Sequence, residues 1–414
     1  MAHEPALTES KTYFPEWMSE GRVLSLAFGI IPVLSIVAPR GLAVVLPLAA
    51  ILGGASALTR GRLGRPPRTL GGLVVITLAW AAISFYWAET PELVWPAWRT
   101  IALMAVAGLV LFGVSARMPA GERERIASGV FWGVVIALGV LAFEIVVARA
   151  IFGGSIAILF AGPRHLQPYV FNRAAVTLAL FVWPAALVVW RRRGALSAIG
   201  LIAATAIVIA PLESQSALVG VLAGLAVCGA AWLRPRLTAL VLAAGLAGGV
   251  ALAPAIPHLP VVADWTTRRD ISVSVYHRLE IWTFVADTIA ERPLRGWGLN
   301  SSRDLPGGEV EIGPGIRRIS LHPHNAYLQL WLELGAIGAT LGTLLVLLGF
   351  DAARRCARPG DLSARNAASL TIAQVAAAAI MVGISYGLWQ AWWMADLWLA
   401  AAVSGVLTSR LNET

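Results

Sequence analysis

The chain has 414 residues, of which 58% are hydrophobic and only 13% are charged. Its mean hydropathy of +0.73 is too high for a soluble domain, so a soluble globular fold is excluded. The net charge of +9 could suit nucleic acid, but the arginines are placed in a way that argues against this partner.

Many apolar runs approach the length that crosses the hydrocarbon core of a bilayer. We therefore predict an all-α polytopic membrane protein with about 12 transmembrane helices, in one membrane domain over residues 1–414. The short alternating segments of a transmembrane β-barrel are absent. No signal peptide precedes the first run, so we expect the first span to stay uncleaved. The predicted spans are residues 23–39, 41–58, 70–87, 98–115, 126–152, 173–190, 195–211, 216–233, 237–254, 325–350, 367–388 and 391–408.

Every second loop between the predicted spans is rich in arginine. By the positive-inside rule these loops lie in the cytoplasm. Both termini are therefore predicted to be cytoplasmic, and a large loop, 255–324, is predicted to face the other side of a bacterial inner membrane. The arginines that carry this argument are Arg60, Arg62, Arg65, Arg68, Arg117, Arg123, Arg125, Arg191, Arg192, Arg193, Arg234, Arg236, Arg354, Arg355, Arg358 and Arg365.

The two cysteines give no sign of a disulfide framework, because Cys228 lies within a span and Cys356 in a cytoplasmic loop. The patterns GxxxxGK[ST], HExxH and CxxC are absent from the sequence. We therefore expect neither nucleotide coupling nor a structural zinc site, and no cofactor.

Positive residues on the outer side need a reason, and loop 255–324 has eight of them. Arginine binds phosphate through a planar pair of hydrogen bonds. A single arginine could equally meet lipid phosphates, but the whole set, grouped with histidines, predicts an anionic substrate. The set comprises Arg268, Arg269, Arg278, Arg292, Arg295, Arg303, Arg317 and Arg318, with Arg164 and Arg173 at span six and His165, His258, His277, His322 and His324.

The large loop is predicted to contain a helix over residues 273–291. Apolar residues repeat along one face of this segment, Pro293 ends it, and Gly296-Trp297-Gly298 makes a turn. Such an amphipathic helix can lie along the membrane surface. It would hold Arg278 over a cavity between the spans.

Polar residues also stand at the outer ends of the apolar spans. Asn172 and Arg173 begin span six, and Ser214 and Gln215 lie in the short turn between spans seven and eight. Residues at such positions either bind substrate or only cap helices.

Span twelve contains an unusual carboxylate, Asp396. A carboxylate within the membrane is either a functional group or a structural partner of an arginine. Trp389, Trp392 and Trp393 nearby fit an aromatic belt at the outer interface.

The segment His322-Pro323-His324-Asn325 opens span ten. Histidine is the side chain that titrates near neutral pH, so these residues suit proton transfer. We predict that His324 removes a proton and that His322 supports it. Two alternatives stay open: both histidines could cap the span, or they could form a zinc pair, although a third ligand is not evident.

Four motifs together resemble the O-antigen ligase superfamily, which also contains O-antigen polymerases and protein O-oligosaccharyltransferases. They are Arg278-Leu-Glu-Ile-Trp282, Pro293-Leu-Arg-Gly-Trp-Gly298, His322-Pro-His-Asn-Ala-Tyr-Leu-Gln-Leu330 and Glu333-Leu-Gly335. The motifs cover residues 278–335, and the hydropathy pattern extends the resemblance over nearly the whole chain.

The resemblance implies a periplasm-facing glycosyltransferase that inverts the anomeric centre and needs no metal. Its donor would be a glycan on undecaprenyl diphosphate, and its acceptor a sugar hydroxyl of lipid A–core or another glycan. Carried over by motif, His324 becomes the base and Arg278 a diphosphate ligand. Many relatives have an arginine where this chain has Gln215, so we expect Arg173 or another arginine to substitute. The substrate-binding candidates are Asn172, Arg173, Ser214, Gln215, Arg268, Arg269, Arg317 and Asn325.

Three other functions remain. A polymerase of the same superfamily would use similar groups but a lipid-linked glycan acceptor. A transporter of lipid-linked glycans could have twelve spans, yet the sequence has no strong internal repeat. A scaffolding membrane protein is the third.

Overall fold

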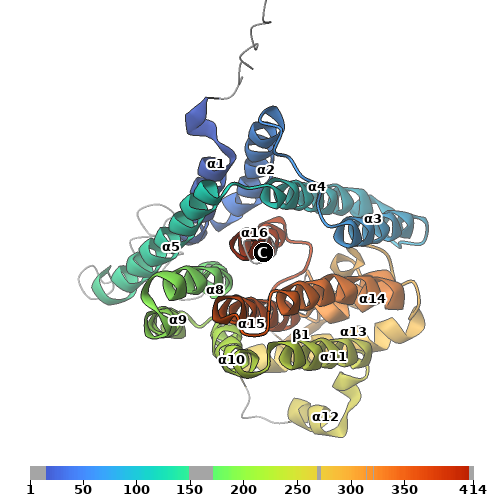
Figure 1. Ribbon diagram of the computed structural model, residues 1–414. Helices are drawn as coiled ribbons and strands as arrows, with labels where there is room; N and C mark the ends of the chain where they lie inside the picture. The colour runs from blue at the N-terminus through green and yellow to red at the C-terminus, as the bar shows by residue number, and fades with distance from the viewer. Residues whose placement is uncertain (1–14, 149–170, 268–271, 314, 320, 410–414) are drawn as a thin grey trace, which may run out of the picture.

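The computed structural model describes residues 15–148, 171–267, 272–313, 315–319 and 321–409, and most of them are helical (Figure 1). Within these ranges, 12 helical stretches are long and apolar enough to cross a membrane. The prediction of an all-α polytopic membrane protein is therefore confirmed.

The first part of the chain forms five long helices joined by short 3-10 turns and closes with a π-helical turn. These elements are η1 (Glu16–Met18), α1 (Glu20–Val37), η2 (Pro39–Gly41), α2 (Leu42–Thr59), α3 (Arg68–Ile83), η3 (Ser84–Tyr86), α4 (Pro91–Ala116), α5 (Ala120–Phe143) and η4 (Glu144–Ala148). Span four was predicted to begin at residue 98, but α4 begins at Pro91, which suits the first helical turn because its missing N–H has no partner there.

The middle of the chain adds four further spans and the elements of the large loop. They are α8 (Asn172–Arg193), α9 (Ala195–Ile209), η7 (Ala210–Leu212), α10 (Gln215–Leu233), α11 (Pro235–Leu252), η8 (Ile256–His258), α12 (Pro260–Thr267), α13 (Val273–Glu291), η9 (Ser301–Arg303), β1 (Glu311–Gly313) and β2 (Ile316–Arg317). The helix predicted over 273–291 is thus confirmed as α13.

The last three helices are α14 (Ala326–Arg355), α15 (Leu362–Ile384) and α16 (Ala391–Thr408). Span eleven was predicted to run to residue 388, but α15 ends at Ile384. The prediction was wrong here because the following residues are apolar enough to extend a hydropathy run, although Ser385 has non-helical dihedral angles (φ −124°, ψ −99°).

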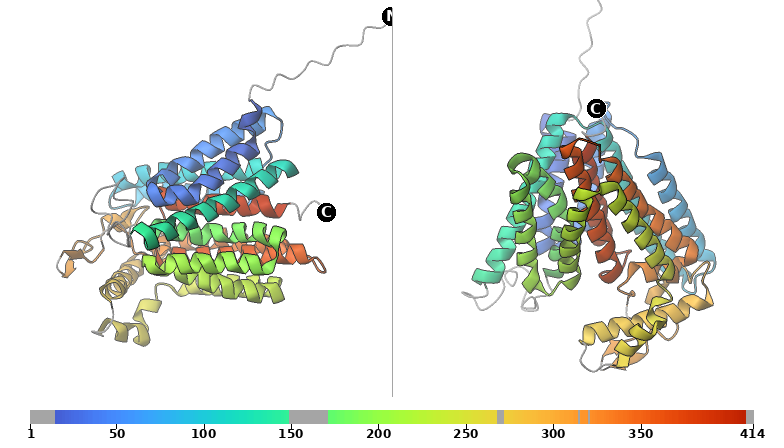
Figure 2. Two further views of the ribbon diagram at one scale, coloured as in Figure 1. Left: turned by 90° about the vertical axis from the view of Figure 1, so that its left-hand side faces the viewer. Right: turned by 60° about the horizontal axis from the view of Figure 1, so that its bottom comes forward.

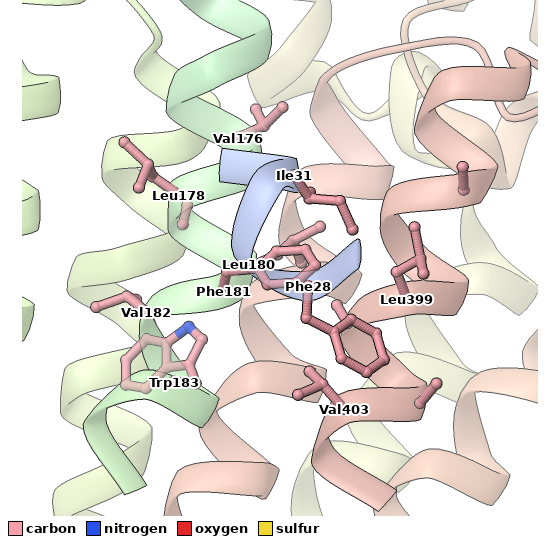
Figure 3. Packing of buried hydrophobic residues seen from close by; sticks show 14 of the residues in the cluster. Phe28, Ile31, Val176, Leu178, Leu180, Phe181, Val182, Trp183, Leu399 and Val403 are labelled. Atoms are coloured by element: carbon pink, nitrogen blue, oxygen red, sulfur yellow. The ribbon is translucent and has the colours of Figure 1, made fainter. Parts of the chain in front are cut away.

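Helices α8 and α16 lie at the centre of the bundle, and the other spans surround them (Figure 1). Phe181 of α8, Phe28 of α1 and Val403 of α16 are fully buried and pack in one cluster, as the close view shows (Figure 3). Trp183 of α8 packs against α10, where a Cβ on Gly224 would come within 2.3 Å of its ring. Burial of this aromatic and aliphatic surface fixes α8 and α16 as the frame of the molecule.

The elements of loop 255–324 gather at one end of the bundle, opposite the end where α1 begins and α16 stops (Figure 2). Helix α13 buries Ile281, Val285 and Ile289 in a second apolar cluster with Leu328 and Leu332 of α14. Strands β1 and β2 pair antiparallel, with Glu311 opposite Arg317 and Gly313 opposite Ile316. The predicted apolar face of α13 therefore rests on the start of α14.

Candidate active site

The His322–Asn325 segment is held between α13 and the first turn of α14. Asn325 caps α14, because its Oδ1 accepts hydrogen bonds from the backbone N–H groups of Tyr327 (3.0 Å) and Leu328 (3.1 Å). Trp282 of α13 donates from Nε1 to the Pro323 carbonyl at 2.9 Å. The cap uses the amide oxygen of Asn325, so only its Nδ2 group is left to meet a substrate.

His324 is half-buried and is oriented by a single backbone carbonyl. Its Nδ1 lies 2.9 Å from the Ser385 oxygen. A carbonyl can only accept, so Nδ1 carries the hydrogen and Nε2 keeps its lone pair. Burial lowers the pKa of His324, the bond to Ser385 partly opposes this, and the charges of Arg278 and His277 lower it further. The imidazole is neutral near pH 7 and can accept a proton at Nε2.

The backbone at His324 is unusual, with a φ of +56° in the left-handed region. Non-glycine residues rarely adopt this conformation, and it persists only where the surroundings enforce it. His322 helps to enforce this conformation, because its Nδ1 accepts the backbone N–H of His324 at 3.2 Å. The two rings lie with centroids 4.3 Å apart.

His322 faces N–H donors at both ring nitrogens. The N–H of Gly387 points at its Nε2 from 3.3 Å, and Gln390 Nε2 lies 3.1 Å from the same atom. A neutral ring accepts one of these bonds, whereas an imidazolium would accept none of them. Burial, His324 and Arg303 together lower the pKa of His322 to about 3. His322 is therefore suited to holding His324 in place and not to taking up a proton.

The residues between α15 and α16, here called the 385–390 segment, contact both histidines. Ser385 accepts from His324, the Gly387 nitrogen lies 3.3 Å from His322 Nε2, and the Leu388 N–H donates to Gln329 Oε1 at 2.9 Å. Sequence reasoning missed this segment because its apolar residues extend a predicted span. The Ser385-Tyr386-Gly387 interruption and the nearby Gln390 are the only signals of it in the sequence.

A fully buried carboxylate, Glu333 of α14, ties the segment to the large loop. It accepts hydrogen bonds from Ser302 Oγ (2.6 Å), Gln329 Nε2 (3.0 Å), the Asn300 N–H (2.6 Å) and Trp389 Nε1 (2.5 Å). A buried charge is tolerated when its oxygens are satisfied in this way. Glu333 thus joins the large loop, α14 and the 385–390 segment.

The turn predicted at Gly296–Gly298 packs directly on α14. Gly296 and Gly335 both have positive φ, +70° and +65°. A Cβ on Gly296 would lie 2.6 Å from the Gly335 nitrogen, and one on Gly335 would lie 2.2 Å from the Leu294 oxygen. Only glycine permits this approach. The motif residues around positions 296 and 333 therefore form the frame of the site.

Two half-buried arginines lie near Tyr386 of the 385–390 segment. Arg278 has no ion pair or hydrogen bond with any residue in the described part of the chain, and burial lowers its pKa. Arg173 places its guanidinium over the Trp392 ring, 5.3 Å from the centroid. The charges of both arginines act on Tyr386. Helices α8 and α13 thus bring two cations close to Tyr386, where they could hold an anion.

The turn between α9 and α10 also reaches this region. Ser216 Oγ lies 3.1 Å from Ser385 Oγ, next to the carbonyl that orients His324. Ser214 is buried, whereas Gln215 and Glu213 are exposed. Ser214 is the N-cap residue of α10, but its side chain makes no capping hydrogen bond to that helix.

Of the remaining candidates, Arg317 has an exposed side chain, and its carbonyl accepts from His277 Nε2 at 2.9 Å. Asn172 has a buried Oδ1 without a hydrogen-bond partner among the described residues. Arg268 and Arg269 lie outside the described residues. The structure therefore brings His322, His324, Arg278 and Arg173 together and leaves Gln215 and the Arg317 side chain at the surface.

Two expectations about the last span need revision. Trp392 and Trp393 have exposed fractions of only 5% and 0%, so the prediction that they form an aromatic belt was wrong. They pack inside the protein against Tyr386. Asp396 is fully buried and accepts from Thr177 Oγ1 at 2.6 Å, so its partner is a threonine, not an arginine.

No group of three His, Cys, Asp or Glu residues that could hold a metal ion occurs among the residues that the structure describes. The arrangement instead offers a neutral imidazole beside two guanidinium groups. Such a site can remove a proton from a hydroxyl group while it stabilises negative charge on a phosphate.

The family model that matches this chain covers Arg278, His322 and His324. Residues 198–341 match the family model described as O-antigen ligase. A Rickettsia conorii protein named "Putative polysaccharide ligase" is 35% identical over 152 residues, which are 34% of this chain and 36% of the relative. A Rickettsia bellii protein of the same name is 37% identical over 131 residues, covering 30% and 31%. The chain thus spans about a third of the length of the curated relatives it matches.

Proposed function

Because the chain belongs to the O-antigen ligase superfamily, we propose that it transfers a glycan from undecaprenyl diphosphate to a sugar hydroxyl of lipid A–core. The family match and the names of the relatives support a glycosyl-transfer enzyme of the ligase type. The identity of the donor, the identity of the acceptor and the periplasmic position of the site are parts of this proposal.

The observation that carries the proposal is that Arg278 lies close enough to His324 for its charge to act on the imidazole. His324 is neutral, with Nδ1 bound to Ser385 and Nε2 available. Arg278 is half-buried and has no protein partner among the described residues. A cation left unpaired in a partly buried place is costly unless an anion binds there. A diphosphate is an anion of the right kind, since its oxygens match the geometry of a guanidinium.

In the proposed reaction, the acceptor hydroxyl attacks the anomeric carbon of the donor glycan. His324 Nε2 takes the hydroxyl proton as the new C–O bond forms. The bond between the anomeric carbon and the diphosphate oxygen breaks, and its electron pair leaves with the diphosphate. Arg278 and Arg173 stabilise the charge on the leaving group. One displacement of this kind inverts the anomeric centre and needs no protein nucleophile.

The other candidates take supporting roles in this proposal. His322 holds the backbone of His324 and stays neutral. Arg173 substitutes for the arginine that relatives have at the position of Gln215. Asn172, Ser214 and Asn325 line the outer ends of α8, α10 and α14, where they could contact either substrate. We still predict that Arg268, Arg269 and Arg317 contact either the substrate or lipid phosphates.

The proposed orientation puts this site in the periplasm and both termini in the cytoplasm of a bacterial inner membrane. The arginine-rich loops support it through the positive-inside rule. So does the arrangement in which α13 lies at the end of the bundle opposite the start of α1 and the end of α16 (Figure 2).

The experiment supplies purified protein with a lipid-linked glycan, with and without lipid A–core. Transfer that requires the core supports the ligase. A ladder of longer glycans without the core means that the protein is instead a polymerase of the same superfamily. Translocation of the lipid-linked glycan without any new glycosidic bond would mean a transporter and would overturn the proposal.

A further inference from the structure

Tyr386 lies at the centre of the site, although nothing in the motifs points to it. Its neighbours in the chain are Ser385, which accepts from His324, and Gly387, whose nitrogen lies 3.3 Å from His322 Nε2. The backbone at position 386 therefore lies between a hydrogen bond to His324 on one side and close packing on the His322 ring on the other.

The ring of Tyr386 is also fixed. It meets the Trp392 ring edge to face, with centroids 4.7 Å apart and planes at 82°, and the Trp393 ring at 6.1 Å. Trp392 is held in turn by a hydrogen bond from its Nε1 to Gln390 Oε1 at 2.8 Å. The guanidinium of Arg173 also contacts Trp392 and lies 5.3 Å from the centroid of its ring. The edge-to-face packing of the two rings places the phenol near this cation.

The hydroxyl group of Tyr386 has no hydrogen-bond partner among the described residues, although the side chain is half-buried. Tyr327 shows the usual arrangement, since its hydroxyl donates to the Ala379 carbonyl at 2.6 Å. Burial raises the pKa of Tyr386 to about 12, in spite of the opposing charges of Arg173 and Arg278. The phenol is thus a neutral donor that lies within the field of both arginines.

We propose that the Tyr386 hydroxyl donates a hydrogen bond to the same phosphate oxygens that Arg173 and Arg278 bind. This inference rests on the proposed function, because it takes the donor diphosphate as the anion. A phosphate oxygen accepts well from a phenol, and a bond to a charged acceptor is stronger than one between neutral groups. Tyr386 would then be a third ligand of the diphosphate, supplied by the 385–390 segment.

The test uses Tyr386→Phe, which removes the hydroxyl and keeps the ring packed on Trp392. Tyr327→Phe is the matched control, since it removes a hydroxyl whose partner is the protein itself. Purified proteins are titrated with undecaprenyl diphosphate that carries no glycan, and transfer is measured with the donor and the acceptor varied separately.

We expect Tyr386→Phe to lower the affinity for the diphosphate probe, or kcat/KM for the donor, by about 10-fold or more. The apparent affinity for the acceptor should be unchanged. Tyr327→Phe should bind the probe like the wild type. Equal probe binding and equal transfer in Tyr386→Phe and wild type would overturn the role of Tyr386 and leave the proposed function standing. If the wild type neither binds the probe nor transfers a glycan, the proposed function itself fails, and this inference fails with it.

Discussion

Replacing Arg278 by alanine should impair the use of the donor without destabilising the protein. The guanidinium is half-buried and has no hydrogen bond or ion pair among the described residues, so its loss breaks no such bond in that part of the chain. One hydrogen bond to a charged group contributes about 1.5–3 kcal/mol. That range corresponds to a loss of roughly 10- to 150-fold in rate or affinity.

Arg278→Lys should be nearly as poor as alanine, because an ammonium group cannot form the paired hydrogen bonds of a guanidinium. The contact should strengthen as charge develops on the leaving diphosphate. We therefore expect kcat and kcat/KM for the donor to fall together, with the apparent affinity for the acceptor unchanged.

The assay titrates donor and acceptor separately and follows thermal unfolding of the same variants in detergent. Arg295→Ala is the control, since Arg295 is an exposed arginine at the same end of the molecule, with its guanidinium 5.9 Å from the Trp87 centroid. A defect of Arg278→Ala confined to the acceptor would refute the reasoning, because the arginine would then belong to the acceptor's phosphates.

Three further predictions concern pH, the buried carboxylate and metal. Because the pKa of His324 is lowered from its usual value near 6.5, kcat/KM should stay constant as pH falls to about 6.5 and drop only below it, as the base is protonated; half-loss of activity above pH 6.5 would contradict this. Glu333→Ala leaves four donors without their acceptor and should lower the unfolding temperature and the activity strongly, whereas Glu333→Gln keeps one accepting oxygen and should be milder; equal stability of both variants would argue against the role of Glu333. Transfer should survive EDTA, and activity restored only by a divalent ion would show that the arginines do not suffice.

The long helices could be predicted from the sequence, because each signal for them is local. Hydropathy and length gave all 12 spans, and the apolar period with Pro293 behind it gave α13 with its observed bounds. A turn was predicted at Gly296-Trp297-Gly298, and both glycines indeed have positive φ.

The contacts that hold the site residues in place could not be predicted, because they join residues far apart in the chain. Gly387 and His322 are 65 positions apart, and Trp389 and Glu333 are 56 apart. Hydropathy also cannot distinguish a tryptophan that faces lipid from one that is buried in protein. For this reason Trp392 and Trp393 were assigned to the membrane interface, and Tyr386 was overlooked.

The central claim is that His324 accepts the proton of the attacking hydroxyl, and the most direct measurement is transfer by His324→Asn. Asparagine tolerates the left-handed backbone that His324 adopts, so this variant removes the base and keeps the turn. His324→Ala serves as a second variant, and thermal unfolding checks that both remain folded. We predict that transfer falls by about 10²- to 10⁴-fold in both variants while binding of undecaprenyl diphosphate persists. Transfer near the wild-type rate in folded His324→Asn would contradict the account.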